Sequence, residues 1–163
     1  MKRILLIFVI LFFLVATTFP QSRFDFDCYQ KYKKCIKENK EAKIPCYFEF
    51  CNFEQCICKE TKVINPITHH EDTDPGAWGT AITVCSPWAQ SISQCIDNYY
   101  KENGDNDCKT SSKLKTLTLK TINKLKELKT KIKRFKKRGK GLNDFEKKIE
   151  KQIKLLENAI KDK

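Results

Sequence analysis

Glycine and histidine are scarce in this sequence, with five glycines and two histidines among 163 residues. The chain therefore has no glycine-rich phosphate-binding loop, and it also lacks the Gly-x-Ser-x-Gly and His-Glu-x-x-His motifs of common hydrolases. No Asn-x-Ser/Thr sequon occurs, so N-glycosylation is not expected. Because no motif indicates catalysis, we predict a protein that is not an enzyme and that has no cofactor and no small-molecule substrate.

An apolar run long enough to span a membrane is also missing. Residues 4–16 are apolar without a break and follow two basic residues, but even when extended to Phe19 the run has only sixteen residues, short of the about 20 that a span needs. With small residues at Ala16 and Thr18, this layout is typical of a secretory signal peptide, assigned to residues 1–18. The alternative is an uncleaved type II membrane anchor with the body outside the cytoplasm. We predict a secreted protein.

Cysteine, by contrast, is abundant, with nine residues in the chain. In an oxidising compartment such a count indicates disulfides, which compensate for a small core, rather than a zinc site. Spacings of seven and of ten residues each occur twice, and two antiparallel helices that turn near Lys43 would place the cysteines of the seven-residue pairs opposite one another. The candidate disulfides are Cys28–Cys58, Cys35–Cys51, Cys46–Cys95 and Cys56–Cys85. Cys108 is left over and either forms an intermolecular disulfide or pairs within the chain and leaves another cysteine over.

Residues 23–108 are predicted to form a cysteine-rich helical domain. Apolar residues at three- and four-residue spacing indicate three helical segments. One lies around residues 28–36, one begins with Pro45 at its first helical position, and one covers residues 86–101 with Ser86 as its N-cap. Cys108 follows the last of these segments and is expected to lie outside every helix.

The segment between the second and third helices, residues 59–84, contains two prolines and two glycines. It is predicted to be mainly loop, with short strands near residues 62–67 and 80–84. Both histidines lie here beside three carboxylates, a combination that can hold Zn²⁺ or Cu²⁺. Asp-Pro-Gly is strong turn chemistry, so we favour a solvated acidic turn and predict no metal site. The residues concerned are His69, His70, Glu71, Asp72 and Asp74.

Charge divides the sequence into two parts. Residues 4–108 carry ten basic and fourteen acidic side chains, whereas residues 109–163 carry twenty basic and six acidic ones. The acidic segment 101–108 contains glycine and asparagine and is predicted to be the linker. A charge distribution this asymmetric bears on the partners of a protein rather than on its fold.

Residues 109–163 are predicted to form a basic amphipathic helical hairpin. Its first helix runs from a cap at Ser111 or Ser112 to about residue 138, and its second begins at Asn143, which opens a capping box. The predicted fold class is therefore mostly α, with a small disulfide-stapled helical head followed by a basic antiparallel two-helix hairpin. The apolar stripes of the two helices bury each other, lie in a membrane interface, or pair with another chain.

The first tail helix has little negative charge to balance its cations, since residues 113–140 hold thirteen basic side chains and one acid, Glu127. Close like charges cost stability, whereas an anionic membrane or polymer would return free energy for each cation. We predict binding to an anionic polysaccharide, an anionic lipid membrane or a microbial surface; compositional drift toward lysine codons is the alternative origin of the run. The candidate anion-binding residues are Lys124, Lys126, Lys129, Lys131, Lys133, Arg134, Lys136, Lys137, Arg138 and Lys140.

Nucleic acid is disfavoured as the partner, because its readers interleave aromatic residues or glutamines with their cations. A secreted binding protein of this kind suits a defence, venom or salivary-type effector. The alternative is a structural protein that assembles as a homodimer through its tail helices and Cys108. A third class, a ligand carrier, needs an apolar pocket lined by the aromatic residues of the head. The basic triplet at residues 136–138 also resembles a processing site.

Overall fold

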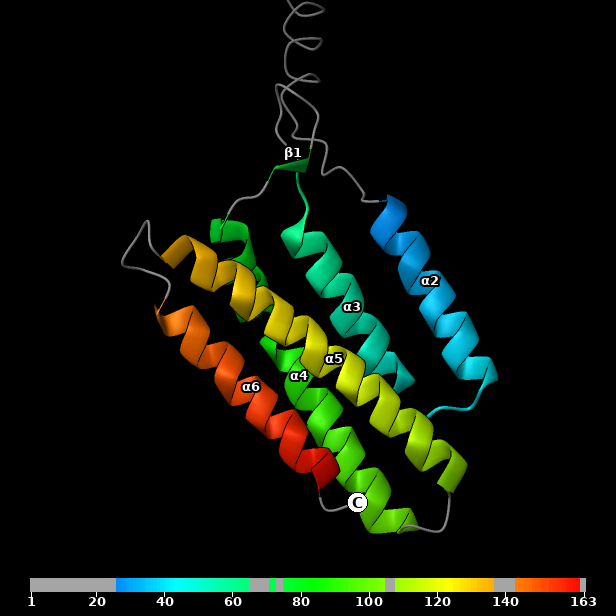
Figure 1. Cartoon of the computed structure of the whole chain (residues 1–163). Helices are drawn as coiled ribbons and strands as arrows, with labels where there is room; N and C mark the ends of the chain where they lie inside the picture. The colour runs from blue at the N-terminus through cyan, green and yellow to red at the C-terminus, as the bar shows by residue number, and fades with distance from the viewer. Residues whose placement is uncertain (1–25, 65–70, 73–74, 105–107, 137–142, 162–163) are drawn as a thin grey trace, which may run out of the picture.

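The computed structural model describes residues 26–64, 71–72, 75–104, 108–136 and 143–161 (Figure 1). The predicted signal peptide, residues 1–18, lies outside the described residues. The described helices are α2 (Phe26–Glu41), α3 (Tyr47–Thr61), α4 (Pro75–Asn103), α5 (Cys108–Lys136) and α6 (Asn143–Lys161), and the strands are β1 (Val63–Ile64) and β2 (Glu71–Asp72). The fold is mostly helical and stapled by disulfides, as the sequence predicted. Among the described residues, no helix combines the length and the apolar character needed to cross a membrane.

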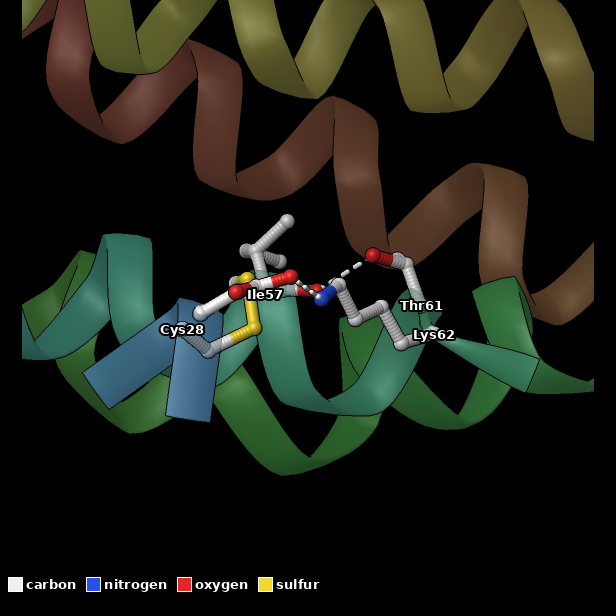
Figure 2. Close-up of a disulfide and its surroundings, with 6 residues drawn as sticks. Cys28, Ile57, Thr61 and Lys62 are labelled. Atoms are coloured by element: carbon white, nitrogen blue, oxygen red, sulfur yellow. Dashed lines mark hydrogen bonds and ion pairs between the residues drawn. A yellow bond between two sulfur atoms is a disulfide. The ribbon is translucent and has the colours of Figure 1, made fainter. Parts of the chain in front are cut away.

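Helices α2 and α3 form an antiparallel hairpin. Two disulfides join them, Cys28–Cys58 and Cys35–Cys51, and in both the Cα atoms are 5.7 Å apart. The residue numbers of the partners rise along α2 as they fall along α3, which is the register of antiparallel helices. At the end of the hairpin opposite its turn, the ammonium of Lys62 lies 3.3 Å from Asp27 Oδ2, beside the disulfide Cys28–Cys58 (Figure 2).

The turn of this hairpin passes through two residues with left-handed backbone. Lys43 has φ 50° and Cys46 has φ 65°. The predicted turn near Lys43 is therefore present, but the prediction that Pro45 is the first residue of the next helix is wrong. Cys46 is the N-cap and the helix begins at Tyr47, because a left-handed residue cannot continue a right-handed helix.

Helix α4 is one continuous helix, and this corrects two predictions. Residues 75–84 are helical rather than loop or strand, and the predicted N-cap Ser86 lies inside the helix together with Pro87. The buried residues show the reason, because they follow three- and four-residue spacing on both sides of Pro87, which is itself exposed. They are Trp78, Ala81, Ile82, Cys85, Ala89, Ile92 and Ile96. Burial of this stripe outweighs the hydrogen bond that the proline removes.

The other two disulfides fasten α3 to α4. They are Cys46–Cys95 and Cys56–Cys85, each with a Cα–Cα distance of 5.7 Å. The partner numbers again change in opposite directions, so α3 and α4 are antiparallel. All four bridges are the pairs that the cysteine spacing suggested. Cys108 is outside these bridges and exposed, but it is the first residue of α5, which corrects the prediction that it lies outside every helix.

Helices α4, α5 and α6 form an up–down–up bundle, in which α5 and α6 are the predicted antiparallel hairpin (Figure 1). Gly104, with φ 58°, ends α4 and donates its N–H to the Tyr100 carbonyl at 3.0 Å, a helix end that suits glycine. The Tyr100 hydroxyl lies 2.8 Å from Ser111 Oγ, across the connection to α5. Helix α4 extends to Asn103 and α5 begins at Cys108, so the connection between them is shorter than the predicted linker, residues 101–108.

The apolar core is shared by both parts of the sequence. Buried residues of α3 and α4 are in one cluster with the buried stripes of α5 and α6. The tail helices therefore bury each other, which is the first of the three alternatives for their stripes, and they also pack against α4. The two-stranded pair Val63–Ile64 and Glu71–Asp72 is antiparallel, and only its first strand falls within the predicted strand positions.

Candidate anion-binding surface

Helix α5 carries its cations on both sides of a buried stripe. Because the stripe faces the core, the lysines are divided into two flanks that face different neighbours. One flank, the α6 flank, consists of Lys126, Lys129 and Lys133. The other, the α3 flank, consists of Lys120, Lys124 and Lys131. The buried stripe is Leu114, Thr118, Thr121, Ile122, Leu125, Leu128 and Ile132.

The α6 flank is neutralised by acidic residues of the neighbouring helix. Each of its lysines forms an ion pair with a glutamate of α6, at N–O distances of 2.9, 2.7 and 3.3 Å. The pairs are Lys126–Glu157, Lys129–Glu150 and Lys133–Glu146. These cations are already committed within the hairpin, so they contribute less to the field outside the molecule.

The ion pair between Lys129 and Glu150 affects the pKa of the carboxyl group. The hydrogen bond from Lys129, and then its positive charge, lower the pKa of the Glu150 carboxyl below its ordinary value. Glu150 is exposed, so water and salt screen this interaction. The direction of this shift agrees with the ion pair of 2.7 Å between Lys129 and Glu150.

The α3 flank borders two hollows beside the head. The first has a volume of about 310 Å³ and lies among α2, α3 and α5, with Lys120 on its α5 side. The second has a volume of about 450 Å³ and has Lys124 and Lys131 on its α5 side. Among the described residues, Lys120 and Lys124 take part in no ion pair.

Lys131 is more constrained than the other two lysines of the α3 flank. Its ammonium is 2.9 Å from Glu127 Oε1, one helical turn away. It also lies 5.6 Å from the centroid of the Trp78 ring, a cation–π distance. Trp78 is buried, so this contact anchors α5 to the start of α4.

The remaining predicted cations are at or beyond the end of α5. Arg134 is exposed near its C-terminus, and Lys136 is its last residue. Lys137, Arg138 and Lys140 lie outside the described residues. The structure thus brings together only part of the predicted anion-binding set, and it separates that part into two flanks with different surroundings.

The sequence reasoning missed two lysines of α2. Lys31 lines both hollows across from α5, and Lys34 lines the first of them. Their part of the sequence has more acids than bases, so composition alone drew no attention to them. Their spacing of three residues on a helix was the signal that could have placed them on one side of α2.

A separate hollow of about 520 Å³ lies between α4 and α6, with Lys148 and Lys151 at its edge. Lys148 is 3.5 Å from the Thr83 hydroxyl and 6.0 Å from the Phe145 ring. Gln152 hydrogen-bonds Ser86 across the floor. This hollow has fewer cations than the two beside the head.

No group of three or more histidine, cysteine, aspartate or glutamate side chains that could hold a metal occurs among the residues that the structure describes. His69, His70 and Asp74, from the predicted acidic turn, lie outside them. No protein-family model matches the chain, and no similar protein was found among curated proteins or solved structures.

Proposed function

We propose that this is a secreted, non-enzymatic binding protein whose cationic C-terminal helices engage anionic polymers or surfaces. The observation that carries the proposal is the unequal treatment of the two flanks of α5. Glutamates of α6 neutralise one flank, whereas Lys120 and Lys124 on the other have no ion pair among the described residues. Uncompensated cations on a rigid helix are pre-organised to meet negative charge.

Burial of the apolar stripes favours contact through charge rather than insertion into a bilayer. The five large aliphatic residues of the α5 stripe are buried in the core. Exposing them to turn α5 toward lipid would sacrifice about 1.5–3 kcal/mol for each, so roughly 10 kcal/mol in all. An anionic polymer needs no such opening, and neither does an anionic surface bound through lysines alone.

Secretion is part of the proposal. Four disulfides suit an oxidising compartment, and the apolar N-terminal run is typical of a secretory signal peptide. Expression of the full chain in a eukaryotic secretory host, with mass spectrometry of the medium, tests this directly. We expect a released protein that begins near residue 19, and retention on the cell membrane would favour the type II anchor.

Binding to immobilised heparin and to vesicles of phosphatidylglycerol and phosphatidylcholine tests the function. We expect the protein to bind heparin at about 0.1 M salt and to elute well before 1 M, because the screening length falls from about 10 to 3 Å over this range. Binding that persists at 1 M would point to apolar contacts, and no binding to either anion at 0.1 M would refute the proposal.

The alternative assembly role now depends on Cys108. The tail stripes are buried within one chain, so they do not offer an apolar face to a second copy. Cys108 is exposed and lies outside the four disulfides, which favours an intermolecular bridge if assembly occurs. A dimer on a non-reducing gel that disappears in Cys108→Ser would support this role, and a monomer with one alkylated thiol would exclude the bridge.

A further inference from the structure

We propose that the groove between α5 and the α2–α3 hairpin binds a single linear sulfated polysaccharide chain, and we call it the head groove. This inference deepens the proposed function and rests on it. The groove consists of the two hollows beside the α3 flank, which share Lys31 and Glu54 and are therefore adjacent. In Figure 1, α2 and α5 lie on either side of α3, which supplies the floor.

The charges along the head groove are mainly positive. Six lysines and two glutamates line it. Three of the lysines have acidic partners: Lys34 pairs with Glu38, Lys62 with Asp27 and Lys131 with Glu127. The other three, Lys31, Lys120 and Lys124, have no ion pair among the described residues, and they lie on both walls of the groove.

The shape of the head groove fits an extended chain. Its α5 wall extends from Leu117 to Lys131, which is about 21 Å at the rise of an α-helix. Cations placed along such a length can contact successive sulfates of one polymer, and each contact releases condensed counterions. A single small anion would use only one end of the groove.

The surroundings of the head groove do not suit a bilayer. Its lysines border hollows between helices, so a flat membrane surface would not enter the space between the two walls. The large exposed apolar residues, which would have to insert into lipid, are Phe26, Phe48, Val84 and Leu119. None of these lines either hollow.

Glu54 is the acid of the head groove that most opposes an anion, because the other glutamate, Glu38, is paired with Lys34. It lines both hollows from α3, and among the described residues it forms no ion pair. A bound sulfate chain would pass close to this carboxylate. Removing its charge should therefore strengthen binding, which is an unusual expectation for a substitution in a binding site.

Three full-length variants test the head groove with heparin as the probe. The groove variant is K31Q/K120Q/K124Q, and the control is K126Q/K129Q/K133Q, which removes the same charge from the α6 flank. The third variant is Glu54→Gln. Affinity is measured between about 0.05 and 0.3 M salt, and thermal unfolding followed by circular dichroism verifies that each variant is folded.

We expect the groove variant to bind heparin far more weakly than the control does. Its plot of log affinity against log salt should become shallower by about 2, because each lysine that no longer neutralises a sulfate lowers the slope by roughly 0.7, the value for a flexible single-stranded polyanion. Glu54→Gln should bind about two- to fivefold more tightly, the size of effect expected for one exposed charge interaction.

Other outcomes separate the head groove from the broader function. Equal weakening in the groove variant and the control, with wild-type binding intact, would overturn the groove and leave the proposed function standing. A greater weakening in a fourth variant, K148Q/K151Q, would overturn the head groove and assign the binding site to the hollow between α4 and α6. Binding to anionic vesicles but not to heparin would also overturn the proposal, and failure of the wild type to bind either probe would remove its foundation.

Discussion

Replacing Gly79 with alanine should destabilise the protein, although alanine is the better helix former. Gly79 lies in α4, and a Cβ atom added there would be 2.6, 2.8 and 2.9 Å from three ring atoms of Phe145 in α6. These separations are far below ordinary carbon–carbon contact. The substitution therefore probes the packing of the C-terminal helix against the disulfide-bonded part of the molecule.

The magnitude follows from two opposing effects. Glycine to alanine inside a helix gains about 1 kcal/mol from conformational entropy. Overpacking a fitted contact costs about 1–3 kcal/mol. The sum for Gly79→Ala is a destabilisation of up to about 2 kcal/mol, measured by urea unfolding at constant m-value.

A second substitution, at Phe145, shows whether the effect of Gly79→Ala comes from contact with this ring. Phe145→Leu removes the ring, so in that background Gly79→Ala should become neutral or stabilising by up to about 1 kcal/mol. The double-mutant cycle should give a coupling energy of about 1–3 kcal/mol between the two positions. If Gly79→Ala stabilises the protein equally with and without the ring, α6 does not pack on α4 through this pair of residues.

Two other predictions concern the covalent and ionic links. Replacing both cysteines of Cys46–Cys95, which closes a loop of 49 residues, should lower the free energy of unfolding by about 4 kcal/mol. Replacing both cysteines of Cys35–Cys51, which closes only 16 residues, should lower it by about 3 kcal/mol. Equal urea midpoints for the two variants would contradict the loop-entropy argument. The stability difference between wild type and Lys129→Gln should be present at pH 7 and disappear as the pH falls below about 4.3, because a lowered pKa of Glu150 stabilises the fold only while the carboxyl is ionised. A difference that stays constant down to pH 2 would show that Lys129 acts through packing instead.

The disulfide pairs could be predicted from the sequence because antiparallel helices impose a simple rule. Two cysteines on one helix face two on the next only if both pairs have the same spacing, and Cys28, Cys35, Cys51 and Cys58 satisfy this condition. The start of the last helix at Asn143 was equally local, since a polar side chain and the acidic turn after it indicate a helix start. Both predictions needed only short-range geometry.

The first half of α4 could not be predicted in this way. Pro75, Gly76, Gly79 and Pro87 together are typical of a loop. Their helical conformation depends on burial of residues such as Trp78 against α3, α5 and α6, and that burial exists only once the chain is folded. Tertiary packing overrode local propensity here.

The candidate site was predicted in composition but not in arrangement. The run of cations in α5 was visible in the sequence, whereas its division into flanks depends on the register between α5 and α6. That register decides that Lys126 meets Glu157 while Lys124 faces the head groove. Lys31 escaped notice because it is distant in sequence and becomes a neighbour of α5 only through the α2–α3 hairpin.

The position of the last bridged cysteine determines how the molecule would respond to mechanical force. Cys95 closes the final disulfide, so pulling on the C-terminus loads no cross-link in the 68 residues that follow it. Those residues could extend to about 240 Å at roughly 3.5 Å per residue, while residues 28–95 stay clamped by four bridges. In a molecule tethered through its C-terminal helices, these helices would therefore extend under force while the disulfide-bonded part keeps its shape.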